Sequence, residues 1–453
     1  MLTMPRIMLF INLLTCGIAS CQNATVENYI AKGLENNLAL QRQNLSLEQS
    51  FEMLKIAKGM FYPTLTFNSD YTYAAGGRNI VLPLGDLLNP AYNSLNQLTG
   101  SNNFPNVPNQ EFNLSANDYF DNRLHLTLPL VNAGILLNKK IKKEAISQKQ
   151  AEVIVFKRGL VRDIKLAYYN IVMVNQQIEI FNNADKLLLD NFKITQSRFA
   201  NGKALKGSVL RIQSDINENH AKRIEAQNRL KTAYAYLNFL TNESLGNHVN
   251  IDTTGFKSTE KSLLGAVPNP QDEREEITAL KSSLNQASFT VTLRKSAYLP
   301  VISTFLDGGY QSTYLKFNTD SRYLLGGVSM KWDIFSGFQN KHKIDMARKD
   351  MEILKSKISE SANQYEYLRL TAQNELESAV AQLRSNTENI FFLEEYYRET
   401  KSRYDQGMVL LLELNDALTQ LINARLQYEV SNTTVLVKKA ELERNTASYH
   451  FNL

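Results

Sequence analysis

The residues that could do metal or acid–base chemistry are scattered along this chain of 453 residues. No ligand-type spacing relates the five histidines, His125, His220, His248, His342 and His450. No glycine-rich loop stands between a strand and a helix in the arrangement that binds phosphate. Acidic pairs are frequent, but solvated helical faces require them, and no nucleophile is paired with a base. The sequence therefore predicts no enzyme, no metal site and no cofactor.

Cysteine chemistry is confined to the start of the chain, where Cys16 and Cys21 lie. The basic Arg6, an apolar run over 7–14 and the small residues after it are typical of a cleaved secretory signal, which we place at residues 1–21. The sequence Ile-Ala-Ser-Cys that ends at Cys21 is typical of a lipobox, in which Cys21 becomes the acylated first residue. Ordinary signal-peptidase cleavage at the same place fits equally well. Both alternatives predict an exported protein without a disulfide.

Charge and hydropathy argue against a nucleic-acid-binding protein and against a protein with a membrane-spanning helix. The net charge is +5 and 21% of residues are charged, so nothing indicates a nucleic-acid partner. After the signal, no stretch supplies the roughly 18 consecutive apolar residues that a membrane-spanning helix needs. An exported chain can still cross a membrane as a β-barrel, so the predicted strands decide whether this chain is a membrane protein.

Two sequences of the form Arg-aromatic-x-x-Gly, Arg198–Gly202 and Arg403–Gly407, lie 205 residues apart (407 − 202). Each closes one long helical run and opens another. A glycine there suits a helix C-terminus, where a left-handed residue ends the hydrogen-bond ladder. The pair predicts a duplicated helical hairpin.

Helical patterning predicts the elements that position these two reversals. We expect helices at about 24–60, 135–199, 208–240, 272–297, 338–404 and 410–447. Each of the two longest would extend about 100 Å, at 1.5 Å per residue. Helices of that length imply coiled-coil-like pairing.

Alternation of apolar and polar residues predicts four strands, at about 64–73, 120–131, 301–314 and 323–335. Pro63 and Pro300 stop the helices that precede the first and third strands. About ten residues suffice to cross a bilayer at a tilt. The Asn-, Gly- and Pro-rich segment 74–118 carries few charges, and we expect it to be a long external loop.

The order of these elements predicts two repeats, residues 22–243 and 272–453, separated by a segment at 244–271. The strand–helix junctions 129–134 and 333–338 are offset by 204 residues (333 − 129), close to the offset of the reversals. Four strands cannot close a barrel, and open edges are not tolerated in lipid. We therefore expect a mainly α chain with a transmembrane β-barrel, in which three copies supply twelve strands and the helices project as a tube.

These features resemble the TolC-like outer-membrane efflux proteins over essentially the whole mature chain. The resemblance rests on the helix–Tyr-Pro–strand unit at 57–65 and its copy at 295–301, the two strand–helix junctions and the two reversals. It implies a homotrimer in the outer membrane of a Gram-negative bacterium, with an α-barrel in the periplasm and an equatorial region that includes 244–272. The implied function is the exit duct of a tripartite efflux or type I secretion system. The implied partners are a periplasmic adaptor (membrane fusion) protein, an inner-membrane transporter of RND, ABC or MFS type, and outer-membrane lipid.

The resemblance also assigns roles to residues at the two reversals. In the family, the adaptor contacts small and apolar residues beside the reversal glycines. The matching residues are Gly202, Lys203, Ala204, Gly407, Met408 and Val409. For each glycine the alternative is a plain helix cap.

A carboxylate ring and a gate are the other family features. Glu413 and Asp416 match the selectivity ring, and their i, i+3 spacing places both on one helix face. Their alternative role is a solvated polar face beside the leucines of a coiled-coil seam. Tyr404 matches the gate tyrosine. Ser208 and Val409 stand where an Asp–Arg link holds the gate shut, so that link is missing here.

An exported trimeric coiled-coil adhesin or stalk without a channel is the alternative function. It accounts for the helices but not for four alternating strands in duplicate. The sequence does not separate drug or metal efflux from protein secretion.

Overall fold

The computed structural model describes residues 26–76, 78–113, 118–251 and 274–451. Contacts divide the chain into two units, and each draws on both halves of the sequence. The first comprises residues 1–47, 149–280 and 357–453; the second comprises residues 48–148 and 281–356. The predicted signal, with Cys21, and most of the predicted inter-repeat segment lie outside the described residues.

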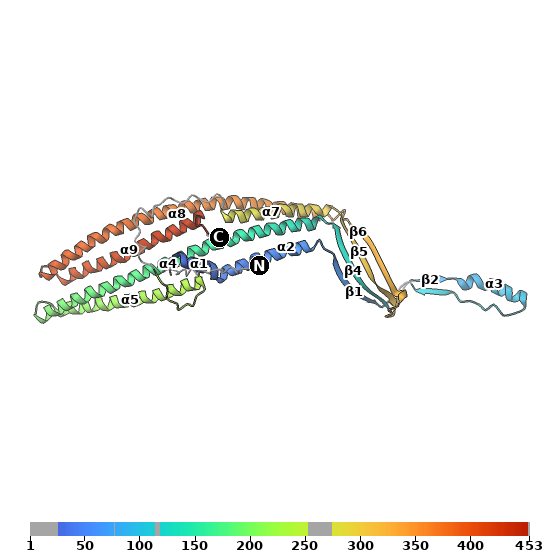
Figure 1. Cartoon of the computed structure of the whole chain (residues 1–453), viewed down its shortest axis with the longest axis horizontal. Coiled ribbons are helices and arrows are strands. Elements are labelled where there is room, and N and C mark those ends of the chain that lie inside the picture. The colour runs from blue at the N-terminus through green and yellow to red at the C-terminus, as the bar shows by residue number, and fades with distance from the viewer. Residues whose placement is uncertain (1–25, 77, 114–117, 252–273, 452–453) are drawn as a thin grey trace, which may run out of the picture. The chain divides into compact units, whose positions relative to one another are not determined.

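Two antiparallel helical hairpins dominate the first unit (Figure 1). One joins α4 (Ala133–Ala200) to α5 (Lys206–Thr241), and the other joins α8 (Gln339–Asp405) to α9 (Leu411–Thr446). The ends of these helices differ from the predicted ones by one or two residues. The first parts of α4 and α8 belong to the second unit.

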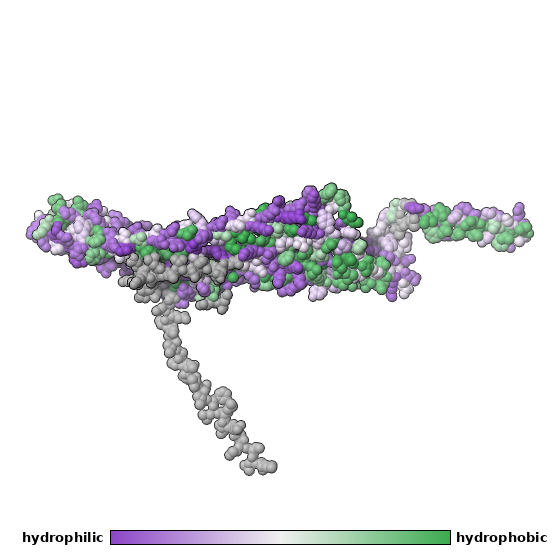
Figure 2. Space-filling model, turned by 90° about the horizontal axis from the view of Figure 1, so that it is seen from above, coloured by the Kyte–Doolittle hydropathy of each residue, from purple (hydrophilic) through white to green (hydrophobic). Residues whose placement is uncertain are grey.

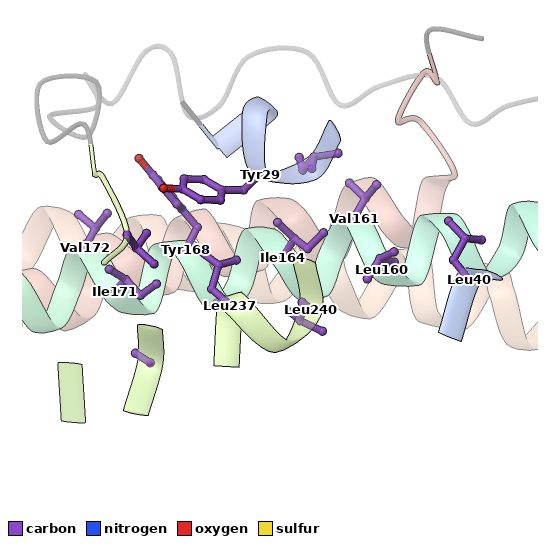
Figure 3. Packing of buried hydrophobic residues seen from close by; sticks show 14 of the residues in the cluster. Tyr29, Leu40, Leu160, Val161, Ile164, Tyr168, Ile171, Val172, Leu237 and Leu240 are labelled. Carbon is purple, nitrogen blue, oxygen red and sulfur yellow. The ribbon is translucent and has the colours of Figure 1, made fainter. Parts of the chain in front are cut away.

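The core of the first unit forms where α1 (Val26–Asn36) packs against α4 and α5. Ile30 is almost fully buried there. So are Ile164 and Leu237, which Figure 3 labels. A Cβ on Gly33 would lie 2.3 Å from Ile164 Cδ1, so a larger residue there would force the end of the Ile164 side chain to move.

Asn37 divides the helix predicted over 24–60 into α1 and α2 (Leu38–Gly59), so the prediction of one helix was wrong. Its side-chain Nδ2 donates to the Leu240 carbonyl at 2.8 Å, and its Oδ1 accepts from the Leu40 amide at 2.9 Å. Asn37 is therefore the N-cap of α2, and its side chain competes with the backbone hydrogen bonds that would continue a single helix.

A half-buried charge network holds the end of α9 in the same unit. Glu276, at the start of α7 (Glu275–Lys295), accepts from Arg274 at 3.0 Å and from Arg444 at 2.8 Å. Arg274 also donates to the carbonyl of Asn445 and lies 4.1 Å from the centre of the Tyr365 ring. These contacts join the start of α7 to α8 and to the C-terminal end of α9.

An antiparallel sheet is the main element of the second unit, with the strand order β1-β4-β5-β6. Its strands are β1 (Thr64–Thr72), β4 (Tyr119–Val131), β5 (Val301–Thr313) and β6 (Arg322–Lys331). Strands β4 and β5 form the centre, so the two halves of the sequence meet there. Strands β1 and β6 are open edges within the described part of one chain.

The two faces of the sheet differ in polarity. Register aligns Leu65, Leu126 and Leu306 across three strands on one face. On the other face, His125 pairs with Asp307, and Arg123 pairs with Asp121. Figure 2 shows apolar side chains gathered over the strands. Many apolar residues of the sheet are exposed, among them Val328 at 68%.

The segment 74–118 is not the plain loop that the sequence predicts. It contains β2 (Asn79–Leu82), α3 (Leu84–Thr99) and β3 (Gln110–Asn113), and β2 pairs with β3. Its asparagines explain the difference, because they bind the chain that returns from α3. Asn89 exchanges two hydrogen bonds with the backbone of Val107, at 2.7 and 3.0 Å. Asn96 does the same with Phe104, at 2.8 and 3.0 Å.

Strand β6 ends at Lys331, four residues before the predicted end at 335. Its neighbour β5 begins at Val301, after Pro300, and Val301 pairs with Lys331, so the ladder has no further partner. Trp332 lies beyond the strand and donates from Nε1 to the Tyr298 carbonyl at 3.0 Å. Across the described residues, no helix combines the length and the apolar character that crossing a membrane requires.

Candidate functional site at the hairpin tips

The turns α4–α5 and α8–α9 share one backbone geometry, and we call them the first and second tips. In the first tip, the Lys203 amide donates to the Arg198 carbonyl at 2.7 Å and the Gly202 amide donates to the Phe199 carbonyl at 2.9 Å. Gly202 has φ 68°. This pair of bonds with a left-handed residue is the Schellman motif.

The second tip repeats these bonds. The Met408 amide donates to the Arg403 carbonyl and the Gly407 amide to the Tyr404 carbonyl, both at 2.9 Å. Gly407 has φ 79°. The capping role of both glycines is therefore present in the structure, while contact with an adaptor stays a prediction.

Exposed side chains at the tips include those expected to meet an adaptor. Lys203 and Met408 are exposed, and Ala204 and Val409 are half-buried. Sequence reasoning missed Leu205, which is 79% exposed, and did not assign the 70% exposed Leu410 to the contact. Each leucine lies three residues after a reversal glycine, and this repeated spacing is the signal that could have found them.

Tyr404 is buried in contact with the first hairpin. Its side chain is 4% exposed, and its hydroxyl lies 3.1 Å from Thr195 Oγ1. The Arg198 guanidinium lies 4.1 Å from the centre of its ring. Nη2 of Arg198 donates to the carbonyls of Tyr404 at 2.7 Å and Asp405 at 3.2 Å. Arg198 thus caps the C-terminus of α8, and sequence reasoning missed this contact with the other tip.

Apolar packing supports this contact from both hairpins. Leu188 of α4 and Tyr397 of α8 join Leu414, Ala417 and Leu418 of α9 in one buried cluster. The two hairpins are therefore held together next to the tips by a shared apolar cluster.

Glu413 and Asp416 lie exposed on the face of α9 opposite that cluster. Glu413 Oε1 accepts from the Leu410 amide at 3.4 Å, and Asp416 Oδ2 accepts from Gln420 Nε2 at 2.6 Å. Both carboxylates are thus free to face solvent, and Glu413 also caps its helix. Their arrangement in a ring stays a prediction.

Ser208 and Val409 stand where the sequence predicts that the Asp–Arg gate link is missing. A different polar contact joins the two hairpins further from the tips. Asp215 of α5 accepts from Asn415 of α9 at 2.8 Å and pairs with Arg211 at 3.1 Å. Burial raises the pKa of the Asp215 carboxyl above its ordinary value, although Arg211 opposes this. This polar contact also ties the two hairpins together.

In the part of the chain that the structure describes, no three His, Cys, Asp or Glu side chains are grouped so that they could bind a metal ion. The first unit thus carries two hairpins that end in paired tips, and the second unit holds a sheet with two open edges.

Comparison with known proteins identifies the family. The model of the outer membrane efflux protein family matches residues 30–243 and 269–447. The chain belongs to this family and is an efflux exit channel of the outer membrane of Gram-negative bacteria, with its helical part in the periplasm. No curated protein sequence matches the chain significantly.

Solved structures agree in fold. VceC of Vibrio cholerae is 14% identical with a TM-score of 0.72, and the match covers 94% of this chain and 96% of that one. The open state of MtrE of Neisseria gonorrhoeae is 15% identical with a TM-score of 0.72, over 93% and 89%. CmeC of Campylobacter jejuni is 14% identical with a TM-score of 0.68, over 93% and 85%.

Proposed function

We propose that three copies of this chain assemble into one exit duct, each copy contributing two repeats. The observation that carries this proposal is the sheet, which has two open edges and one apolar face in a single copy. Unpaired strand edges are too costly in lipid, so β1 of one copy must pair with β6 of the next. Three copies then close the sheet around a pore with the apolar face outward.

The division into repeats 22–243 and 272–453 is part of the same proposal. It is supported by the family model, which matches the chain in two segments, and by the two tips with identical backbone bonds. Each repeat also supplies one of the two central strands of the sheet. The family consists of transport channels, so the chain passes its substrate without catalysis.

The tips dock a periplasmic adaptor, and through it an inner-membrane transporter. Exposed apolar side chains at the end of each hairpin, Leu205, Met408 and Leu410, support this role because an adaptor would remove them from water. Cys21, once exported, anchors the chain by an acyl group if its lipobox is used.

Glu413 and Asp416 form the selectivity ring of this duct. Both are exposed on one face of α9, and threefold symmetry would place three copies of each around the pore. A ring of carboxylates attracts cations and repels anions.

The test is single-channel conductance of the detergent-purified protein in planar bilayers, wild type against Glu413→Ala/Asp416→Ala. We expect small cation-selective openings that lose selectivity in the variant. Glu225→Ala/Glu218→Ala, at exposed positions of α5, is the control and should leave selectivity unchanged. Selectivity that survives the ring variant would discard the ring but keep the duct. Folded protein that never inserts would instead support the coiled-coil stalk.

A further inference from the structure

Helix α3 packs against its own chain along one face. The residues of α3 that are not exposed lie four, three and four positions apart: Gly85, Asn89, Tyr92 and Asn96. The asparagines bind the backbone that returns from the helix, and the Tyr92 ring lies 5.8 Å from the ring of Phe104. A Cβ on Gly85 would lie 2.4 Å from the Val107 carbonyl oxygen. The returning chain therefore covers this face.

A second face of α3 is apolar and uncovered. Apolar residues recur there at alternating steps of four and three: Leu84, Leu88, Ala91, Leu95 and Leu98. With 3.6 residues per turn they lie within about 80° of one another around the helix. All five are exposed, and the leucines range from 36% at Leu84 to 84% at Leu98. This is the spacing of the a and d positions of a coiled coil, and we call these five residues the α3 stripe.

The chain inserts β2, α3 and β3 at the end of the sheet that is remote from the helices. Strands β1 and β4 lie side by side, and Thr72 pairs with Tyr119 at the end where the insertion begins and finishes. Helices α2 and α4 are attached at the opposite ends of the same strands, next to Thr64 and Val131. Because the helical part is periplasmic, α3 lies outside the membrane in the proposed duct.

A ring of copies brings the α3 helices within reach of one another. Each copy contributes four strands, so equivalent attachment points lie roughly 20 Å apart, at about 4.8 Å per strand. The connections to β1 and β4 are residues 73–78 and 114–118. A chain of five or six residues can span roughly 16–20 Å. Each helix therefore needs only part of that reach to meet its neighbours.

We propose that the α3 stripes of three copies pack together as a parallel three-helix seam outside the membrane. Threefold symmetry places the same leucine of each copy at the same level, so the stripes are removed from water together. A helix of 16 residues is marginally stable alone, and such packing stabilises it. The seam rests on the proposed ring of copies and adds to it a second interface that does not use strand pairing.

Charge disfavours the membrane surface as the cover of the α3 stripe. Between Asn79 and Asn113 the chain contains Asp86 and Glu111 but no lysine or arginine. A helix that lies on a membrane typically carries basic residues on its polar face. Asp86 accepts from Asn109 Nδ2 at 3.1 Å, on the side of α3 away from the stripe, so no charge enters the seam.

Crosslinking tests the seam. Leu98→Cys, treated with a short bis-maleimide, should give linked copies on denaturing gels, above the wild-type background from Cys21. Gln97→Cys is the matched control, because Gln97 is also exposed but lies about 100° away around the helix, and it should give severalfold less. Native mass in detergent is measured on the same samples. A trimer in which Leu98→Cys links no better than Gln97→Cys overturns the seam and keeps the proposed assembly. A wild type that forms no trimer overturns both.

Added charge tests whether the seam stabilises the trimer. Leu88→Asp/Leu95→Asp should lower the temperature at which the trimer dissociates on native gels, because it brings two carboxylates from each copy together. Asn93→Asp/Gln97→Asp adds the same charge at exposed positions off the stripe and should dissociate near the wild-type temperature. Equal dissociation temperatures of the two double variants would overturn the proposal.

Labelling with a water-soluble maleimide separates protein from lipid as the cover of the stripe. In the detergent-purified trimer, Leu98→Cys should react severalfold more slowly than Gln97→Cys. Equal rates in detergent, with protection of Leu98→Cys only after reconstitution into phospholipid vesicles, would show that lipid covers the stripe and would overturn the seam.

Discussion

Arg198 shows how one side chain joins two elements that are far apart in sequence. Its two hydrogen bonds reach carbonyls 206 and 207 residues away, at the end of α8. The arginine also covers the ring of Tyr404, whose hydroxyl is held by Thr195. A helix end that is capped by another hairpin cannot fray without separating the two.

Arg198→Ala should therefore lower the free energy of unfolding by about 1.5–3 kcal/mol, the usual effect of losing hydrogen bonds from a charged group. Thermal unfolding in detergent measures it. Arg229→Ala is the control, because Arg229 is 52% exposed and only pairs with Glu225 at 3.9 Å on its own helix. That control should change stability by less than about 0.5 kcal/mol. Equal effects of the two variants would contradict the capping role.

At the scale of elements, we expect the reversal glycine Gly407 and the helical glycine Gly159 to respond oppositely to the same substitution. Gly407 has φ 79° and no atom within 4 Å of an added Cβ, so Gly407→Ala costs only backbone strain, about 1 kcal/mol. Gly159 lies inside α4 with equally open surroundings, so Gly159→Ala should stabilise the protein by about 0.5–1 kcal/mol. Unfolding midpoints of both variants check the signs. A stabilising Gly407→Ala would contradict the left-handed cap.

The charge network at the end of α9 predicts an acid sensitivity of the first unit. Burial alone would raise the pKa of Glu276, but the hydrogen bond and charge of Arg274, with the charge of Arg444, outweigh it and lower that pKa. A depressed carboxyl pKa stabilises the folded state above the ordinary value of 4.5, and this contribution is lost as pH falls below it.

Glu276→Gln should accordingly destabilise the protein by about 1–3 kcal/mol at pH 7 and by progressively less as pH falls through 4.5. Melting temperatures of both proteins between neutral and acid pH measure the difference. Glu225→Gln, on an exposed face of α5, is the control and should follow the wild type. A difference that stays constant with pH would show that the charge of Glu276 is not responsible.

At the scale of the whole molecule, the two-sided sheet decides how copies assemble. Val328 of β6 is 68% exposed on the apolar face, while its neighbour Ser329 lies on the polar face, 3.3 Å from Ser303 Oγ. In the proposed trimer the first faces lipid and the second faces the pore.

Val328→Arg should therefore cost about 2–4 kcal/mol per copy, the effect of an arginine on a lipid-facing strand, and should reduce the yield of trimer in outer-membrane fractions. Ser329→Arg should leave trimer yield near that of the wild type and alter conductance instead. Native gels of membrane extracts compare the two. Equal loss of trimer from both variants would contradict the assignment of the two faces.

Local patterns by themselves determined most of this architecture. Glycine at a reversal, proline at a helix–strand junction and alternation along a strand act over a few residues, so the hairpins and the sheet were predictable. Family resemblance then supplied the channel. The same local reasoning misjudged 74–118, because its abundant asparagines suggested a loop while Asn89 and Asn96 bind returning backbone across 18 and 8 residues.

Only the tertiary structure decided which distant groups meet. The capping of α8 by Arg198, the break at Asn37 and the end of β6 at Lys331 each depend on a partner that lies elsewhere in the chain. Sequence periodicity reports which face of an element is buried but not what covers it. The partner of a long polar side chain is set by the packing of whole helices, and that is why Arg198 and Arg403, which begin the same Arg-aromatic-x-x-Gly pattern, have different surroundings.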